Sequence, residues 1–502
     1  MKAAMSIKRV LSCSLVLVAV VGSATASEKL VIEAGRIITV QGPEIADGVI
    51  VIEDGRITAI GPASEVEKPW DAPVLGGPEF TAFPGFIEAN TTRGLDRANE
   101  SVDVAPFLDV RDSLDPINFF FEDCKRWGIT TISVQQGSDC VIGGRGRVVK
   151  PHGDTVEEMT VRPSFGLVLS ASPKRGKSRA TQSQALRQAF TDLREHLEQL
   201  VQEKRDGNDR ARREALYQGR DLEGERGKGR AMTATAWKVD GLELVPRGQV
   251  DEKQEPLLDL VEGRVAAFFH CSQPMDVHRA LEIARDNGFL ARTTLILEPA
   301  CWKAADVIAE AGVPVVLTGD LTHTEREPLT GEELETFVPT VYRDAGVRFA
   351  LSSENSSTQS LWYQAALAVG GGVSRQTALE AVTRVPAEIL GLGDRVGALA
   401  EGMDGNVVIL TGDPLSSTTW VDTVVLEGEA VYRRDEDVRN RHLLEGIAQP
   451  GTQPAAGSSD VAAEAEPESE AAMAEPDEAS GEETGPDSGE EASNEEEEDT
   501  EQ

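Results

Sequence analysis

The side chains best suited to chemistry in this sequence stand at the ends of short runs that read as β-strands. His270 ends one such run, Glu298 directly follows a second, and Glu354 closely follows a third. Asn90 and Thr92 stand two residues apart at the end of a fourth. A catalytic zinc needs about three protein N, O or S ligands and an open position for water. One histidine and two carboxylates are the most that these positions offer, so no metal is expected. If a divalent ion is bound, His270 and Glu354 are its predicted ligands.

The same residues also admit roles without a metal. Glu354 is either a solitary general base, which makes it the candidate catalytic residue, or a solvated carboxylate. His270 is either a pocket residue or a histidine hydrogen-bonded to a neighbour. Cys271 does not form a nucleophile pair with His270, because adjacent residues on a strand point to opposite faces. The residues predicted to line a binding pocket are Asn90, Thr92, His270 and Glu298.

A glycine-rich segment runs from Gly143 through Gly144 and Arg145 to Gly146. Backbone N–H groups of such a segment can cradle an anion. A tight turn after a strand explains the glycines equally well. Both interpretations stay open at the level of sequence.

The elements that position these residues alternate between two periodicities. Runs rich in β-branched and apolar residues at 130–134, 165–169, 266–270, 293–297, 313–317 and 347–351 predict strands. Segments between them, such as 277–287 and 303–311, have helical spacing. This alternation predicts a parallel sheet with crossover helices, and its length suits a (β/α)8 barrel.

Both ends of this region carry further strand patterns. Residues 29–83 contain short β-branched runs, and Asp47-Gly48 and Asp54-Gly55 read as turns between them. A second β patch covers residues 406–432. Residues 187–230 are rich in charged residues at helical spacing and predict a solvated helical excursion from the barrel.

The 502-residue chain has a formal net charge of −37, of which −19 lies in residues 451–502, where Lys and Arg are absent. So acidic a protein is an unlikely partner for nucleic acid. The last 52 residues contain almost no large apolar side chains. They cannot bury enough surface to offset the entropy of ordering, and we expect a disordered acidic tail.

The N-terminus has the pattern of a secretory signal peptide. Lys2, Lys8 and Arg9 precede an apolar run over 10–21, which is too short to span a bilayer, and Ala24-Thr25-Ala26 reads as a cleavage site. We expect residues 1–26 to be removed and the protein to be periplasmic or extracellular. A lipoprotein signal at Cys13 is disfavoured, because most of the apolar run follows it. No later apolar segment is long enough for a membrane span.

The chain without its first 26 residues keeps four cysteines, Cys124, Cys140, Cys271 and Cys301. Export makes disulfides possible, but so few cysteines do not make a disulfide framework. Buried free thiols are expected.

One segment resembles a known family. Residues 84–92 read Pro-Gly-Phe-Ile-Glu-Ala-Asn-Thr-Thr and are similar to the first barrel strand of the amidohydrolase superfamily, Pro-Gly-hydrophobic-Ile-Asp-x-His-x-His. Residues 378–397 and 401–408 resemble the last barrel helix of the imidazolonepropionase-like branch and its return into a β-sandwich. Residues 141–159 and 170–175 resemble parts of two loop motifs in a group of exported amidohydrolase-like proteins.

The resemblance implies an α/β fold: a (β/α)8 TIM-type barrel over 84–393 with a composite β-sandwich from 27–83 and 394–435. It implies metal-assisted hydrolysis of non-peptide C–N bonds, with zinc or another divalent metal as the typical cofactor and a small molecule of unknown identity as substrate.

The resemblance also locates the superfamily's metal ligands in this chain. Asn90 and Thr92 stand at the two strand-one histidines, and Val168 stands at the middle-strand lysine, with Ala171 at a nearby glutamate. Strand six offers Glu298 in place of histidine, and strand eight offers Glu354 in place of aspartate. Since so many ligand positions differ at once, the alternative function is an exported, catalytically inactive binding or scaffold protein on the same fold.

Overall fold

A computed structural model describes residues 28–217, 239–354 and 360–445. The predicted signal peptide and acidic tail lie outside these residues, as does part of the charged excursion. The described residues all belong to one compact unit. In the part of the chain that is described, no helix is long and apolar enough to cross a membrane.

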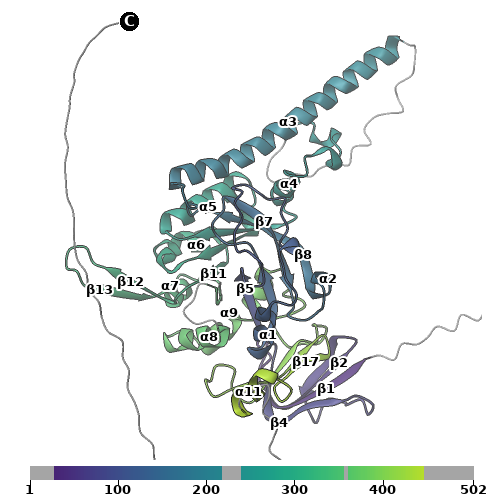
Figure 1. Cartoon of the computed structure of the whole chain (residues 1–502), viewed down its shortest axis with the longest axis vertical. Coiled ribbons are helices and arrows are strands. Elements are labelled where there is room, and N and C mark those ends of the chain that lie inside the picture. The colour runs from purple at the N-terminus through teal and green to yellow at the C-terminus, as the bar shows by residue number, and fades with distance from the viewer. Residues whose placement is uncertain (1–27, 218–238, 355–359, 446–502) are drawn as a thin grey trace, which may run out of the picture. The chain divides into compact units, whose positions relative to one another are not determined.

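Both ends of the chain contribute to a seven-stranded sheet (Figure 1). Its order is β17 (Glu429–Arg433), β16 (Val421–Leu426), β15 (Val407–Leu410), β4 (Val74–Phe83), β1 (Lys29–Ile37), β2 (Ile45–Glu53) and β3 (Arg56–Pro62). The predicted composite β domain is therefore present, as one hydrogen-bonded sheet. β1 and β4 are parallel, and the other neighbours are antiparallel.

The turn predictions in this sheet had different outcomes. Asp54 and Gly55 connect β2 to β3 with φ angles of 49° and 78°, as a tight hairpin requires. Asp47-Gly48 was predicted to be a turn but lies inside β2, where Gly48 pairs with Ala34. A Cβ on Gly48 would lie 2.3 Å from Cδ1 of Ile37, so close packing accounts for this glycine.

The second sheet has eight strands and forms the barrel, which confirms the predicted fold class. Its order is β14 (Phe349–Leu351), β11 (Val315–Leu317), β10 (Thr293–Leu297), β9 (Ala266–Cys271), β8 (Thr160–Ser170), β7 (Ile142–Val149), β6 (Ile129–Val134) and β5 (Phe86–Thr91). Neighbouring strands are parallel except at β7, which is antiparallel to both β6 and β8. The regular (β/α)8 repeat is thus broken by a meander at β6–β8, between which only the four-residue helix α2 (Val156–Met159) occurs.

Helices surround the barrel. They are α1 (Phe119–Arg126), α4 (Glu255–Val261), α5 (Pro274–Asp286), α6 (Ala305–Ala311), α7 (Val338–Asp344), α8 (Leu361–Gly370), α9 (Arg375–Ala381) and α10 (Arg384–Ile389). Alternate strand residues divide into two cores. Ala267, Phe269 and Cys271 of β9 belong to the outer core between strands and helices. Phe268 belongs to the barrel interior, which Val385 of α10 also lines.

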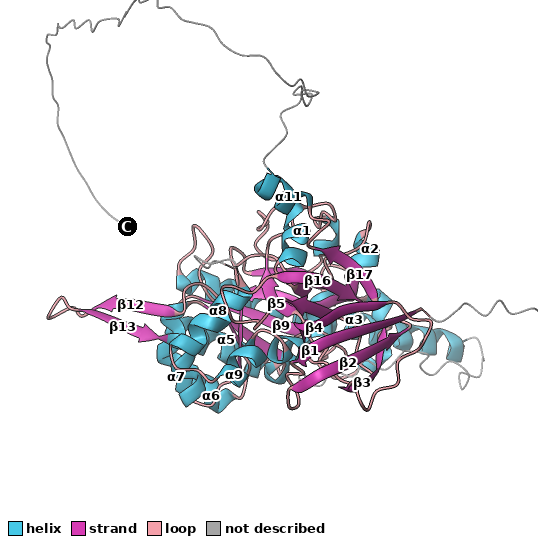
Figure 2. Ribbon diagram, turned by 90° about the horizontal axis from the view of Figure 1, so that it is seen from below, coloured by secondary structure: helices cyan, strands magenta, loops and turns pink. Residues whose placement is uncertain are grey.

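Three further elements extend this plan. α3 (Arg179–Tyr217) is a 39-residue helix, longer at its start than the predicted excursion; its first half is partly buried, and its exposed second half extends past the neighbouring elements (Figure 1). β12 (Thr322–Arg326) and β13 (Glu333–Phe337) form a separate hairpin after β11 (Figure 2). α11 (Val438–Glu445) follows the last strand of the seven-stranded sheet.

Candidate functional site

Side chains join the first and last strands of the barrel. No backbone ladder pairs β5 with β14 within the described residues, where these strands form the two ends of the sheet order. Ser352 Oγ donates to the backbone oxygen of Asn90 at 2.9 Å. The backbone N–H and the hydroxyl of Ser353 both donate to Glu88, at 3.0 and 2.6 Å. We call these contacts, together with those of Glu354, the barrel seam.

Glu354 accepts two hydroxyl groups from the end of β5. Thr91 Oγ1 lies 2.6 Å from its Oε2, and Thr92 Oγ1 lies 2.7 Å from its Oε1. Regular alternation would point these neighbouring threonines to opposite faces. The pairing register of β5 shifts between Glu88 and Thr91, and this irregularity accounts for the shared contact. The structure thus brings together two of the predicted site residues, Thr92 and Glu354, and adds Thr91.

Glu88 stands behind this contact, with only 1% of its surface exposed. Its partners are hydroxyl and amide groups, so no cation compensates for its loss of water. Burial raises the pKa of the Glu88 carboxyl to about 7. Hydrogen bonds from Ser353 and Ser352 oppose the rise, and the charge of Glu354 adds to it. The seam therefore contains a carboxyl group that titrates near neutrality.

His270 lies on β9, at the carboxyl end of the barrel strands where active sites of this fold usually stand. Its neighbour Cys271 packs in the outer core, whereas Phe268, two residues before it, packs in the barrel interior. His270 thus faces the interior, as the argument from alternation predicted. Its Nε2 is buried and has no hydrogen-bond partner among the described residues. Burial lowers the pKa of His270 to about 4, with no charged neighbour contributing.

Gln135 follows β6 and is a second interior polar residue. Its side chain is 1% exposed, and its Nε2 donates to Ser133 Oγ at 2.8 Å. A Cβ on Gly146 would lie 3.0 Å from both Cγ of Gln135 and the ring of Phe165, which belongs to the interior core. Oε1 of Gln135 is buried without a partner in the described chain. The backbone N–H of Gln135 donates to Thr91 at 2.9 Å, which places it beside the seam.

Glu298 and Asn90 do not join this group through any side-chain hydrogen bond between described residues. Glu298 follows β10 with an exposed side chain. Partial loss of hydration and the charge of Asp276 raise the pKa of its carboxyl. Asn90 is 3% exposed and takes part in the seam through its backbone.

Asp276 organises the neighbouring rim at the start of α5. It accepts Arg179 Nε at 2.9 Å, Ser172 Oγ at 3.2 Å and the backbone N–H of Gln273 at 3.0 Å. A cavity of about 570 Å³ beside it is lined by Arg179, Gln273, Pro274, Met275 and His278. The segment 170–175 therefore has a structural role here, since its Ser172 ties β8 to α5.

The glycine-rich segment does not form an anion cradle at Gly144 and Arg145, because both backbone amides are already bonded within the chain. Residues 143–146 lie within β7, not in a loop or turn. The N–H of Gly144 donates to Gln136 Oε1 at 2.9 Å, and the N–H of Arg145 donates to the backbone oxygen of Leu108 at 2.8 Å. A Cβ on Gly144 would lie 2.8 Å from that same oxygen, so close approach of the chain explains the glycine.

The strand-end residues do not fit a superfamily-type metal centre. Within the described ranges, no three His, Cys, Asp or Glu side chains are placed to hold an ion together. Val168 is a buried apolar residue on β8, and Ala171 offers a backbone N–H to the oxygen of His270 at 3.0 Å. Both oxygens of Glu354 accept hydrogen bonds from hydroxyl groups. A hydroxyl group binds a carboxylate less strongly than a cation does, but it is a good partner for a carboxylate that holds no cation.

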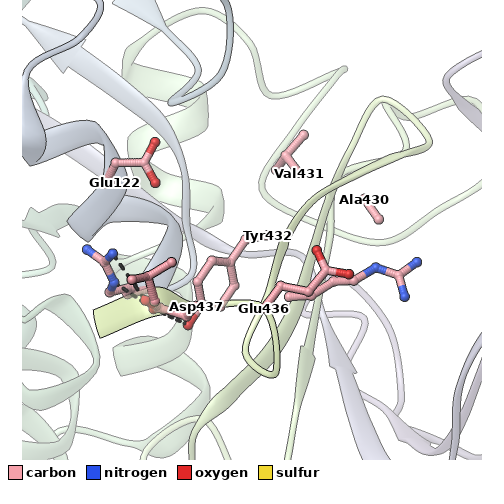
Figure 3. A pocket seen from close by; sticks show the side chains of 9 residues that line it. Glu122, Ala430, Val431, Tyr432, Glu436 and Asp437 are labelled. Atoms are coloured by element: carbon pink, nitrogen blue, oxygen red, sulfur yellow. Dashed lines mark hydrogen bonds and ion pairs between the residues drawn. The ribbon is translucent and has the colours of Figure 1, made fainter. Parts of the chain in front are cut away.

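A cavity of about 280 Å³ lies between α1, β17 and α11 (Figure 3). Two of the charged residues that line it, Arg126 and Asp437, are bonded to each other. Asp437 accepts Arg126 Nε at 2.7 Å and Tyr432 Oη at 3.0 Å. Arg439 donates to Asp123 at 3.0 Å. This network attaches the last described helix to the barrel and leaves no unpaired charge for a ligand among Asp437, Arg126 and Arg439.

The thiols are free and buried, as expected for the described cysteines. Cys301 Sγ donates to the backbone oxygen of Cys271 at 3.2 Å. Burial raises the pKa of both thiols, so neither is poised as a nucleophile.

Sequence reasoning missed Glu88, Thr91, Ser353 and Gln135. Two signals were available. Ser352-Ser353-Glu354 places three polar residues directly after a buried strand, and Gln135-Gln136 does the same after β6. The contacts themselves join residues more than 260 positions apart, which no local pattern reveals.

A profile described as the amidohydrolase family matches residues 308–432. Amidohydrolase tasK from Hapsidospora irregularis is 26% identical over 435 residues, covering 77% of this chain and 40% of the relative. A 5-methylthioadenosine/S-adenosylhomocysteine deaminase from Moorella thermoacetica is 32% identical over 79 residues, covering 16% of this chain and 18% of the relative.

The chain thus spans less than half the length of these two curated relatives. Among solved structures, an amidohydrolase from Thermotoga maritima aligns with a TM-score of 0.62 at 22% identity, over 81% of this chain and 100% of that one. This likeness supports the barrel fold and carries no statement about activity.

Proposed function

Because the chain belongs to the amidohydrolase superfamily, we propose that it is an exported member that binds a small ligand at the barrel mouth without a metal centre. Export rests on the signal-peptide pattern of residues 1–26. The competing function is the class reaction, metal-assisted hydrolysis of non-peptide C–N bonds.

One observation carries this proposal. In the superfamily pattern, the strand-eight acid and the strand-one histidines meet at a metal ion. In this chain the corresponding Glu354 accepts the hydroxyl of Thr92 at 2.7 Å, and Thr91 occupies its other oxygen. A metal ion at this place would link the first and last strands of the barrel. In this chain direct hydrogen bonds form that link.

The donor set supports the same conclusion. Hydroxyl, amide and valine side chains at Thr92, Asn90 and Val168 are not zinc ligands. His270 is the one imidazole at the strand ends named above, and its pKa shows no effect of a neighbouring carboxylate.

Metal content and chelator response test the proposal. Protein purified from its exported form should hold well under one equivalent of zinc by mass spectrometry, and a chelator should leave its melting temperature unchanged. His270→Ala should not alter either result. Restoring Asn90→His and Thr92→His together should not produce hydrolysis, because Val168 still replaces the bridging lysine. Stoichiometric metal with chelator-sensitive hydrolysis of an amide or cyclic imide would establish the competing function.

A further inference from the structure

The interior end of the barrel holds buried polar atoms that the described chain does not satisfy. Oε1 of Gln135 and Nε2 of His270 are both buried without a hydrogen-bond partner there. Native proteins pair the large majority of such atoms, because a buried polar atom without a partner has lost its hydrogen bonds to water and gained none in return. Turning the Gln135 amide over does not remove the problem, since the other polar atom is then the buried one without a partner.

These atoms lie at one end of the barrel. His270 stands near the carboxyl end of β9, and Gln135 stands just past the carboxyl end of β6, both facing the interior. Gln135 is joined to Thr91 through the backbone at 2.9 Å, and Thr91 is joined to Glu354 at 2.6 Å. The three residues therefore stand at the carboxyl end of the barrel strands, the end at which ligands of this fold bind.

Glu354 supplies the charge of the site. Its two threonine contacts fix the orientation of the carboxylate and leave a second lone pair on each oxygen. None of the ion pairs among the described residues includes Glu354, although the chain has 49 Lys and Arg residues. The neighbouring acid is Glu88, which is also without a cation. An oriented carboxylate with free lone pairs and no counterion favours a positively charged donor.

We propose that the barrel mouth binds a small organic ammonium compound, held by Glu354 and by hydrogen bonds to the buried atoms of Gln135 and His270. The inference rests on the proposed metal-free binding function and names its ligand class. The ammonium group of the ligand serves as the counterion of Glu354 and donates a charge-assisted hydrogen bond to its oriented carboxylate. Uncharged polar groups farther along the ligand satisfy the interior amide and imidazole.

A matched pair of probes tests the charge requirement on the unmodified protein. Putrescine and butanediol have the same four-carbon chain, but only putrescine carries ammonium groups at neutral pH. Isothermal titration at low ionic strength should give binding of putrescine that is roughly tenfold or more tighter than that of butanediol. Added salt should weaken only the putrescine binding. Equal binding of both probes, or binding of neither, overturns the inference.

Variants locate the binding. Glu354→Gln should abolish the preference for putrescine, whereas Glu310→Gln should leave it unchanged, because Glu310 is an exposed residue of α6. Gln135→Leu should weaken both probes, with the fold of each variant checked by near-UV circular dichroism. If Glu310→Gln has the larger effect, the assigned site is wrong. Metal analysis of the same sample separates the two proposals. If the protein holds no metal and does not bind putrescine, only the proposed ligand class is contradicted.

Discussion

Glu88 is a carboxyl group that the fold has removed from water while giving it only neutral partners. Its pKa is about 7 in the folded chain against an ordinary 4.5. Between these two values the folded protein holds a proton that the unfolded chain has released. Stability is therefore highest below pH 4.5 for this group and falls as the pH rises through 7.

We expect Glu88→Gln to remove this pH dependence. The amide keeps a hydrogen-bonding group of the same size but does not titrate, so the free energy of unfolding should fall less between pH 4.5 and 7 than in the parent protein. The difference should be of the order of 3 kcal/mol at most. Urea unfolding at several pH values measures it, with the exposed Glu122→Gln as control. Parallel curves for parent and Glu88→Gln would contradict the assignment.

The sequence predicted where the mouth residues stand but not which of them meet. Asn90, Thr92, His270 and Glu354 do lie at or just beyond strand ends. The contact of Glu354 with both threonines depends on a register shift in β5 that leaves no mark in the sequence. Glu88 was recognised by its burial, and Gln135 was recognised by a buried atom without a hydrogen-bond partner. Both are properties of the folded chain.

At the scale of elements, β7 shows how close packing selects glycine. The segment read as a loop because its glycines resemble turn residues, yet it belongs to β7, where Arg145 and Gly146 pair with β8 and the following residues 147–149 pair with β6. The alternating strand and helix pattern was otherwise predictable, since β6, β9 and β10 fall within a residue of the expected runs. β4 and the β12–β13 hairpin were not predicted, because their sequences mix polar and apolar residues without a clear period.

Two glycine substitutions should therefore have opposite signs. Gly144→Ala places a methyl group 2.8 Å from the backbone oxygen of Leu108, which cannot move away cheaply, and should cost about 1–3 kcal/mol. Gly207→Ala lies in the exposed half of α3 with nothing within 4 Å, and should stabilise by about 0.5–1 kcal/mol because alanine favours helix. Thermal unfolding compares them, and equal shifts would contradict the packing argument.

Shortening a buried leucine of α3 to alanine should cost far more stability than shortening an exposed leucine of the β12–β13 hairpin. Leu193 is fully buried in the outer core, and Leu193→Ala should cost about 2–5 kcal/mol. Leu329, at the tip of the β12–β13 hairpin, is 93% exposed, so Leu329→Ala should change stability by less than about 0.5 kcal/mol. Denaturant titration of both variants tests whether the charged helix is attached to the barrel through its first half.

For the whole molecule, two carboxylates attach the chain's last described helix, and Asp437 is more deeply buried than Asp123. The Asp437 side chain is 1% exposed and meets Arg126, which is 18% exposed. Burial opposes ionisation, but the hydrogen bonds from Arg126 and Tyr432 outweigh it and hold the pKa of Asp437 below its usual value. Its contribution to stability is therefore complete above pH 4 or so and is lost in acid.

Asp437→Asn should cost about 3 kcal/mol at neutral pH, because it leaves a buried guanidinium with a weaker partner. The control is Glu122→Gln in α1, the helix that also carries Arg126. This substitution removes the exposed partner of Lys125 and should cost under about 1 kcal/mol. Chemical unfolding at neutral pH and at successively lower pH compares the two. A difference between the variants that does not shrink as the pH falls would show that ionisation of Asp437 is not the cause.

The division into a barrel and a sheet built from both chain ends was predictable, because strand patterns at residues 29–83 and 406–432 flank the alternating region. The antiparallel meander within the barrel was not, since parallel and antiparallel strands share the same period of two.

The barrel seam also sets an order of events in folding. Its contacts join residues 262 to 265 positions apart, so they close one of the largest loops in the chain. Loop-closure entropy must be overcome before such contacts form, which places them after the transition state. Weakening the seam should then leave the refolding rate nearly constant and accelerate unfolding, so that Thr92→Val shortens the lifetime of the closed barrel.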